Sequence, residues 1–220
     1  MVESIAILGG TGSEGSGLGY RWALAGYDVI IGSRSQERAE AKAAELTSLL
    51  PAGRHIRGAD NRTATAEADL IVLSVPYSAQ EATLNDVKDL LADKLLISVV
   101  VPLKPPKVSR VWLPEAGSAA MEAQQLLGED ARVVVAFQNV SAEHLFDADH
   151  VVNCDVLICG DKKADREVAE RLAQAAGMRG VHAGPLQNAG IVEGLTALLI
   201  SINMRYNIKN SGIRITGIPE

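Results

Sequence analysis

The most constraining feature of this sequence is a glycine-rich turn between an apolar run and a helix-like segment near its beginning. The run Ile5–Leu8 predicts a buried strand, and Gly10, Gly12 and Gly15 follow it with the spacing Gly-x-Gly-x-x-Gly. After a strand, this spacing is typical of a dinucleotide-binding unit. Gly10 would allow the tight turn, Gly12 would let the backbone approach a pyrophosphate, and Gly15 would let the helix pack closely on the strand. Free N–H groups at the helix start favour an anion there, whereas a purely structural turn is the alternative.

Apolar runs alternate with helix-period segments along most of the chain. Several runs are continuous stretches of Val, Ile and Leu, as expected for parallel strands covered on both faces. The sequence therefore predicts an α/β fold with a Rossmann-type doubly wound, mostly parallel sheet and a small C-terminal helical subdomain. We expect strands at Ile5–Leu8, Val29–Ile31, His55–Gly58, Leu70–Val75, Leu95–Val101, Val133–Phe137, Val156–Cys159 and Val181–Ala183, and helices at Ser16–Ala25, Gln36–Leu50, Ala79–Leu91, Ala164–Ala176 and Asn188–Tyr206.

The last part of the chain departs from this alternation. Apolar residues recur at helical spacing between Asn188 and Tyr206, so we expect a helix buried on much of its surface. We interpret residues 1–185 as the dinucleotide-binding Rossmann domain. Residues 186–220 are then a subdomain that packs on the sheet or on a second subunit.

Composition excludes several classes of partner. The net charge is −6 and no run of five or six like charges occurs, which argues against nucleic acid and anionic membranes. No apolar stretch is long enough to span a bilayer and the start lacks a cationic leader, so we expect a cytoplasmic protein. Cys154 and Cys159 are five positions apart in a strand-like run, which places their side chains on opposite faces as buried free thiols. The four histidines show no metal-ligand spacing, so we predict no metal site.

The residues after the second expected strand indicate which dinucleotide binds. An NAD enzyme places Asp or Glu here to bind the ribose hydroxyls, but this chain has Gly32-Ser33-Arg34-Ser35, with Arg38 following. Ser33, Arg34 and Arg38 offer hydroxyl and guanidinium donors that suit a 2′-phosphate. The pattern favours NADP, although both arginines could instead be solvated residues at a helix start.

The fourth and fifth strands end in Ser74-Val75-Pro76-Tyr77 and Val101-Pro102. Ligands of open α/β sheets lie across the carboxyl ends of the strands, so these loops should line the nicotinamide end of the crevice; their prolines would serve equally well as turn residues. The sequence shows no convincing nucleophile with its base, and no general-base His or Lys. Direct hydride transfer between two redox cofactors fits this lack, because the protein then supplies orientation and electrostatics alone.

Several motifs resemble those of NADPH-dependent F420 reductases, and the resemblance covers nearly the whole chain. They are Gly9-Gly10-Thr11-Gly12, Ser33-Arg34, Ser74-Val75-Pro76, the stretch from Ala136 to Ala142, Cys159-Gly160-Asp161, Ala183-Gly184-Pro185-Leu186, Asn203-Met204-Arg205-Tyr206 and Gly212-Ile213-Arg214-Ile215-Thr216-Gly217. The resemblance implies hydride transfer between NADP(H) and the deazaflavin coenzyme F420 by a homodimer. It also implies that residues 186–220 contribute to the deazaflavin site and to the dimer interface.

The resemblance assigns roles residue by residue. It implies that NADP contacts Thr11, Gly12, Ser13 and Glu14 at the pyrophosphate, Ser33, Arg34 and Arg38 at the 2′-phosphate, and Val75, Ala79, Val101 and Ala142 nearer the ribose and nicotinamide. Archaeal relatives carry His at position 138, Ile at 140 and Pro at 141, where this chain has Gln138, Val140 and Ser141. The substitutions weaken a catalytic His role more than the reaction class. We therefore expect Gln138, Asn139 and Val140 to orient the cofactors without acid–base chemistry.

Coenzyme F420 carries a tail of phosphate and glutamates, which calls for a cationic path. Arg205, Lys209 and Arg214 could provide it, although exposed basic residues are commonly just solvated. Two other functions stay open. The first is an NADPH-dependent reductase of a free flavin, a metal chelate or an imine, and the second is a non-catalytic NADP sensor.

Overall fold

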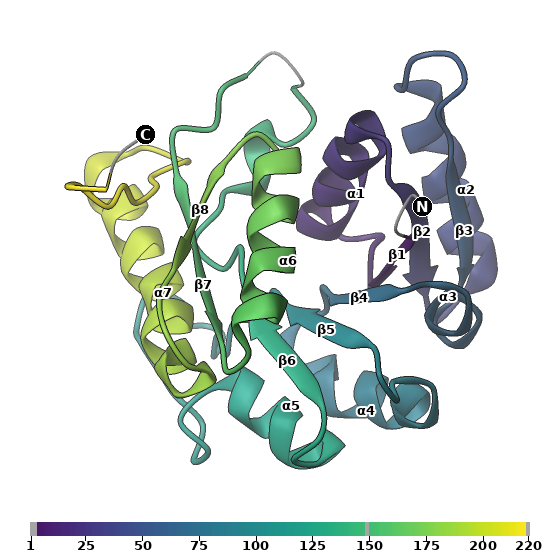
Figure 1. The fold of residues 1–220 in the computed structure, drawn as a ribbon. Coiled ribbons are helices and arrows are strands. Elements are labelled where there is room, and N and C mark those ends of the chain that lie inside the picture. Colours follow the sequence, from purple (N-terminus) through teal and green to yellow (C-terminus); the bar gives the residue numbers. More distant parts are fainter. Residues whose placement is uncertain (1–3, 148–149, 219–220) are drawn as a thin grey trace.

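The computed structural model describes residues 4–147 and 150–218, which form one eight-stranded sheet covered by helices on both faces (Figure 1). The strand order is β3-β2-β1-β4-β5-β6-β7-β8, and the strands pair in parallel except for β6 with β7. The strands are β1 (Ser4–Leu8), β2 (Asp28–Ser33), β3 (Ile56–Asp60), β4 (Leu70–Leu73), β5 (Leu95–Ser98), β6 (Arg132–Val135), β7 (Asp155–Gly160) and β8 (Arg179–His182). This confirms the predicted fold class.

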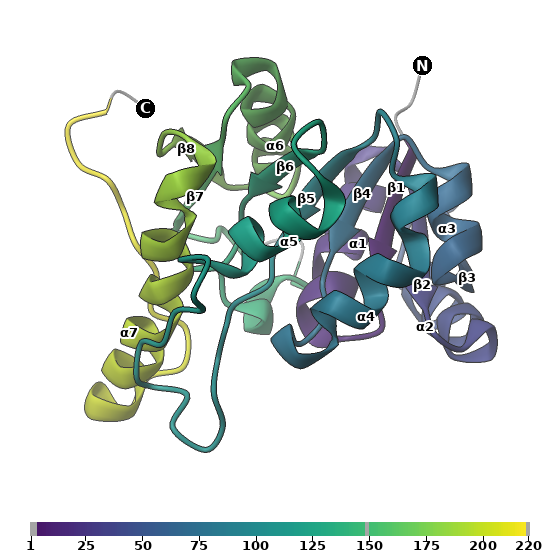
Figure 2. The ribbon, with the colours of Figure 1, turned by 90° about the horizontal axis from the view of Figure 1, so that it is seen from below.

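Two helical layers sandwich the sheet (Figures 1 and 2). One buried cluster joins the sheet to α1 (Ser13–Ala25), α2 (Gln36–Ser48) and α6 (Lys163–Ala175). The other joins the opposite face to α3 (Asn61–Glu67), α4 (Tyr77–Val87), α5 (Ala119–Leu127) and α7 (Ala189–Tyr206). Alternate strand residues enter the two clusters, for example Ile5 and Ile7 in the first and Ala6 and Leu8 in the second, because successive strand side chains point to opposite faces.

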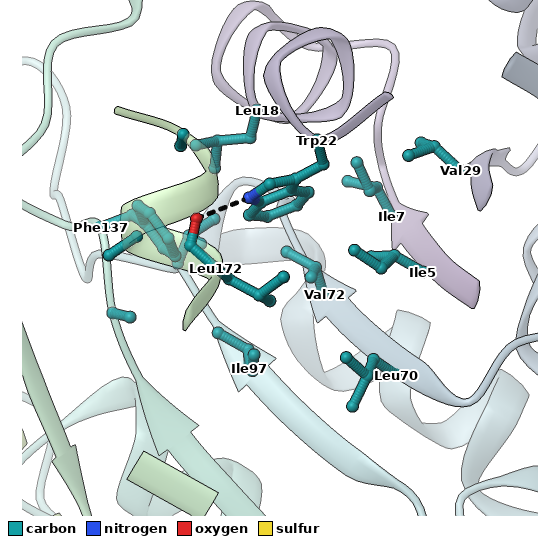
Figure 3. Packing of buried hydrophobic residues seen from close by; sticks show 14 of the residues in the cluster. Ile5, Ile7, Leu18, Trp22, Val29, Leu70, Val72, Ile97, Phe137 and Leu172 are labelled. Carbon is teal, nitrogen blue, oxygen red and sulfur yellow. Dashed lines mark hydrogen bonds between the residues drawn. The ribbon is translucent and has the colours of Figure 1, made fainter. Parts of the chain in front are cut away.

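Trp22 links α1 to α6 and to the segment that follows β6 (Figure 3). Its ring meets Phe137 edge-on with centroids 5.7 Å apart, and its indole Nε1–H donates to the carbonyl oxygen of Leu172 at 2.9 Å. Both aromatic rings are fully buried. Trp22→Ala would cost about 3–5 kcal/mol, since it removes this packing and leaves the carbonyl of Leu172 without its donor.

All eight expected strands are present, but β4, β5 and β6 end two or three residues earlier than their apolar runs suggest. Two helices were not predicted. The side chain of Asp60 accepts from Thr63 N–H to cap α3, and that of Ser118 accepts from Met121 N–H to cap α5. Both helices are short, so local caps and packing on the sheet decide them more than periodicity does.

The prediction that the C-terminal helix is buried on much of its surface holds for residues 189–200, where only Ile191 and Leu198 are exposed, and fails for residues 201–206, where all but Asn203 are exposed. In α7, Val192, Glu193 and Ala197 are buried, while Ile191, Met204 and Tyr206 are 73%, 71% and 71% exposed. Its first half packs against the second buried cluster, α5 and the loop that carries Val111 and Gly117 (Figure 2). No helix in the described ranges is long and apolar enough to cross a membrane.

The tail after α7 returns to the sheet beside β7. The backbone N–H of Asp155 donates to the carbonyl oxygen of Ile213 at 2.7 Å, and that of Ile215 donates to the Asp155 carboxylate at 2.6 Å. Arg179 holds the same buried carboxylate with two bonds, of 3.0 and 2.7 Å. The guanidinium lowers the pKa of Asp155, so this carboxylate stays ionised and keeps the tail in place.

Candidate active site

A pocket of about 1120 Å³ lies at the carboxyl ends of β1, β2 and β4. From β1 the strands β2 and β3 are added on one side of the sheet, and β4 and β5 are added on the other side. The pocket therefore occupies the point where the strand order reverses, which is the usual ligand position of such sheets. It is lined by Gly9, Thr11, Gly12, Ser33, Arg34, Ser35, Arg38, Asn61, Ser74, Val75, Pro76, Ser78, Ala79, Ala82, Thr83 and Asp86.

The individual glycines of the loop have structural roles that differ from those expected from the sequence. Gly9 takes the left-handed backbone of the turn, with φ of +73°, which was expected for Gly10. Gly10 is needed for close packing, because a Cβ there would lie 2.7 Å from the carbonyl oxygen of Ile7. A Cβ at Gly15 would lie 2.9 Å from Ser74 Oγ, while one at Gly12 would meet only the Gly9 carbonyl oxygen at 3.7 Å. The loop is therefore closely packed against the sheet at Gly10 and Gly15, and it has free space at Gly12.

The N-terminus of α1 lies at Gly12, and no side chain caps its first backbone N–H groups. Its N-cap is Gly12, which has no side chain to accept from the N–H groups of the first turn. The N-terminus of α2 differs, because there the Ser35 hydroxyl accepts from Arg38 N–H. Uncapped N–H groups and the positive end of the helix dipole suit a pyrophosphate.

The predicted 2′-phosphate residues lie together on the pocket wall. Ser33 ends β2 and is buried, and its hydroxyl accepts from Ser35 N–H at 3.3 Å. Arg34 and Arg38 are exposed at the pocket edge, and neither has a carboxylate partner among the described residues. The wall therefore carries two uncompensated positive charges.

Sequence reasoning missed the wall supplied by α3 and the second half of α4. Asn61 is buried, and its Oδ1 has no hydrogen-bond donor within the described chain. Thr83 and Asp86 of α4 complete this side. The only signal was the polar pair Asp60-Asn61 directly after a strand, which gains meaning once α3 is known to begin there.

Gly10, Ser13, Glu14 and Gly15 do not line the pocket; Gly10 and Gly15 are buried behind the loop. The Glu14 side chain is only partly exposed, and its Oε1 is sealed from solvent without a partner in the described structure. Burial raises the pKa of Glu14 from 4.5 to about 8. The carboxyl is therefore neutral near pH 7, which spares a pyrophosphate at the helix start from a repelling charge.

Residues 137–140 form a second part of the site, at the carboxyl end of β6. Phe137 has φ of +77°, a conformation that bulky residues adopt only when their surroundings enforce it. Its ring is fixed by Trp22, and Val140 N–H donates back to the Phe137 carbonyl oxygen at 2.9 Å. Strained backbone held in this way is common at functional sites.

The next two residues, Gln138 and Asn139, are hydrogen-bonded to three separate parts of the fold. Gln138 Nε2 donates to Ser98 O at 2.6 Å, and Thr196 Oγ1 of α7 donates to Gln138 O at 2.6 Å. Asn139 Nδ2 donates to Asp155 O at 2.7 Å. Because backbone oxygens only accept, these bonds fix which amide atom is which, and Gln138 Oε1 and Asn139 Oδ1 remain buried with no donor among the described residues.

Helix α7 is tied to the rest of the site by a buried carboxylate that the sequence did not single out. The Glu193 oxygens accept from the N–H groups of Ala119 and Ala120, at 2.7 and 3.0 Å. Burial raises the pKa of Glu193 to about 7, against the lowering effect of these two donors. Glu193 and Thr196 are three positions apart, so one helix side reaches both α5 and the 137–140 segment.

The other predicted site residues lie apart from the large pocket. Val101 lies close to Glu193 of α7, and Ala142 packs against the core beside α1. Arg205 is exposed in the last turn of α7. Cys154 and Cys159 are buried free cysteines, as expected, and burial raises the pKa of both thiols. The described ranges contain no cluster of His, Cys, Asp or Glu that could hold a metal ion.

Known proteins resemble this chain in sequence and in fold. The family described as "NADP oxidoreductase coenzyme F420-dependent" matches residues 4–102. The F420-dependent NADP reductase of Methanothermobacter thermautotrophicus is 42% identical over 100% of this chain and 97% of its own length. This chain belongs to the F420-dependent NADP reductase family. The relative from Methanocaldococcus jannaschii is 40% identical, covering 97% of this chain and 98% of its own.

A solved structure extends the family match to the fold. A putative F420-dependent NADP reductase from Arthrobacter sp. FB24 superposes with a TM-score of 0.80 at 25% identity, covering 97% of this chain and 99% of its own. The family's sequence pattern ends at residue 102, whereas these matches run through α7 and the tail. The C-terminal part is therefore shared with the family as well.

Proposed function

We propose that this F420-dependent NADP reductase family member transfers a hydride directly between NADP(H) and the deazaflavin coenzyme F420. The observation that carries the proposal is the pocket at the strand reversal, which joins an uncapped helix N-terminus to two uncompensated arginines. That combination suits a dinucleotide with an extra phosphate. The full-length relatives named F420-dependent NADP reductase supply the acceptor.

The proposed NADP contacts follow the geometry of the pocket. The backbone of Thr11, Gly12, Ser13 and Glu14 receives the pyrophosphate at the uncapped start of α1, with Gly10 and Gly15 keeping the loop close to the sheet. Ser33, Arg34 and Arg38 bind the 2′-phosphate, and the unpartnered Asn61 Oδ1 suits the amino group of the adenine. Val75, Pro76 and Ala79 on the wall, with Val101 and Ala142 beyond it, lie nearer the ribose and nicotinamide.

The proposed acceptor end is the 137–140 segment. The carbonyl oxygens of the Gln138 and Asn139 side chains lack donors, and both the nicotinamide carboxamide and a deazaflavin ring carry N–H groups that can fill such a role. Val140 adds an apolar wall. These residues orient the rings, and hydride passes between two carbon atoms without a protein acid or base.

We further propose that the protein is a cytoplasmic homodimer. The apolar side chains that α7 leaves exposed in the single chain, Ile191, Leu198 and Ile202, follow one another at helical spacing along one side. Burying such a stripe against its symmetry mate is a common solution for a homodimer. Gel filtration with light scattering should then give twice the chain mass of 23.2 kDa.

The test of the function needs NADPH and a set of acceptors. We expect oxidation of NADPH with simultaneous loss of the deazaflavin absorbance of F420, and much slower oxidation with free flavin, ferric chelate or an imine. Reduction of one of these in place of F420 would contradict the acceptor assignment. Saturable NADPH binding without turnover of any acceptor would indicate a sensor instead.

A further inference from the structure

The loop between β5 and α5 carries a cluster of positive charges that the proposed function does not use. Lys104, Lys107 and Arg110 lie within seven residues of one another, and all three are exposed. None of them has an ion-pair partner among the described residues. In a chain of net charge −6, three neighbouring uncompensated cations are unusual.

Most other cations of the protein are already engaged. Arg57, Arg62, Arg132 and Arg179 pair with carboxylates, and Lys88, Lys94 and Arg166 donate to backbone carbonyls. Arg34 and Arg38, on the pocket wall proposed for the 2′-phosphate, likewise have no ion-pair partner among the described residues. By the same physical logic, the loop cluster suits a second anion.

The loop is held in place by packing at both ends. Lys104 Nζ lies 3.6 Å from the centroid of the Trp112 ring, and Tyr77 meets the same ring edge-on with centroids 5.6 Å apart. The Tyr77 hydroxyl donates to Glu122 of α5 at 2.8 Å. The cation–π contact leaves the Lys104 charge unneutralised, so the cluster keeps its full charge while its backbone is ordered.

Two glycines of α7 let the returning half of the loop pack close to that helix (Figure 2). A Cβ at Gly190 would lie 2.4 Å from the Gly117 carbonyl oxygen, and one at Gly194 would lie 3.4 Å from the Val111 side chain. A larger residue at 190 would push the loop away. The glycines therefore fix where the cations stand relative to α7 and the proposed acceptor end.

The loop also starts beside the proposed acceptor end. It leaves the carboxyl end of β5, where the Ser98 carbonyl oxygen accepts from Gln138, and Val101 lies close to Arg110, Trp112 and Glu193. Three acidic groups stand nearby, one of which is Glu122, the acceptor of the Tyr77 hydroxyl. Glu193 is buried and bound to two backbone N–H groups, and Glu115 is exposed farther along the loop. The exposed part of the loop thus keeps a positive balance.

We propose that Lys104, Lys107 and Arg110 form the docking surface for the anionic side chain of the acceptor, a flexible chain bearing phosphate and carboxylate groups. The inference rests on the proposed function and assigns its acceptor subsite. It replaces the C-terminal cations expected from the sequence, of which Lys209 lies 3.8 Å from Glu143 and Arg214 contacts Asp155 and Asn153. Arg205 is exposed in the last turn of α7 and is the C-terminal alternative.

The experiment compares two acceptors, F420 with its tail and the tail-free deazaflavin core, in the variant Lys107→Gln/Arg110→Gln. Lys104 is retained so that its contact with Trp112 stays intact. The matched control is Lys162→Gln/Lys163→Gln, which removes the same charge at the start of α6. Arg205→Gln tests the C-terminal alternative. The readouts are KM and kcat for both acceptors, and the Kd of F420 from fluorescence without turnover.

We expect the loop variant to raise KM and Kd for F420 about five- to tenfold, as two exposed charge pairs allow. It should leave kcat, NADPH affinity and KM for the tail-free core unchanged. The salt dependence of kcat/KM for F420 should also weaken. Equal F420 affinity in wild type and loop variant, or a larger effect of Arg205→Gln, would overturn the inference alone. A wild-type protein that reduces neither acceptor would refute the proposed function itself.

Discussion

The two ends of the site are built in different ways. At the nucleotide end, backbone groups and loops that directly follow β1, β2 and β4 surround a wide pocket. At the acceptor end, bonds between distant residues hold residues 137–140, with separations of 40 positions for Gln138 to Ser98 and 58 for Thr196 to Gln138. The nucleotide end therefore depends on local conformation, and the acceptor end depends on the assembled fold.

The strongest test of this difference is Gly10→Ala. The new Cβ would lie 2.7 Å from the Ile7 carbonyl oxygen, so the loop must shift, and we expect a loss of about 3 kcal/mol of unfolding free energy together with NADPH binding. Gly12→Ala is the matched control, because its Cβ meets nothing closer than 3.7 Å. It should change stability by less than about 1 kcal/mol while still weakening NADPH binding. Equal stability losses in urea unfolding would contradict the division of roles.

The second prediction concerns which dinucleotide the local wall selects. Ser33→Asp/Arg34→Ala introduces a carboxylate and removes a guanidinium, so NADPH affinity relative to NADH should fall about 100-fold. Fluorescence titration with both nucleotides measures the ratio. Arg54→Ala, an exposed arginine outside the pocket, should leave the ratio unchanged. An unaltered preference in the double variant would refute the NADP assignment.

Asn139→Ala examines the acceptor end in the same way. It removes the bonds to Asp155 O and Cys154 Sγ, which should cost about 2 kcal/mol of stability. We expect kcat to fall several-fold while the Kd of NADPH stays constant, because the nucleotide wall is untouched. Asn188→Ala removes a comparable bond to Ala183 O at an exposed position and serves as the control. A parallel loss of NADPH affinity would show that the two ends are not separable.

The smallest effect should come from Glu14→Gln, and it depends on pH. The pKa of Glu14 is about 8 when folded and 4.5 as its ordinary value, so its contribution to stability is complete below pH 4.5 and is lost as pH rises to about 8. The variant should match wild type at pH 4 and exceed it by about 1–2 kcal/mol at pH 8.5, a discounted figure for a partly exposed group. Urea unfolding at both pH values measures this, and a constant difference would exclude ionisation of Glu14 as the cause.

The sequence predicted the nucleotide end well because its signals are local. The glycine spacing directly after Ile5–Leu8 predicts a phosphate-binding turn. Ser33-Arg34, at the end of β2, predicts a preference for the 2′-phosphate of NADP. Asn61 was missed because the short helix that carries it depends on a cap rather than on periodicity. The exchange of roles between Gly9 and Gly10 was missed because only the structure shows which of the two has positive φ.

The acceptor end could be named only through resemblance. Nothing near Gln138 in the sequence indicates that Thr196 donates to its carbonyl or that Phe137 is strained. Glu193 looks like an ordinary helix residue until α5 is seen to begin against it. The last turns of α7 are exposed where burial was expected, because an apolar helix pattern does not tell which part is covered within one chain.

The attachment of the tail has a consequence for synthesis. Asp155, whose carbonyl oxygen accepts from Asn139, pairs with Arg179 in the sheet and is bonded to the tail through Ile213 and Ile215. A chain interrupted before position 213 would already contain every residue that lines the nucleotide pocket, but it would leave the acceptor segment without its final support. The nucleotide pocket can therefore form earlier during synthesis than the acceptor segment, whose contacts with Thr196 and with the tail-bound Asp155 are completed late in the chain.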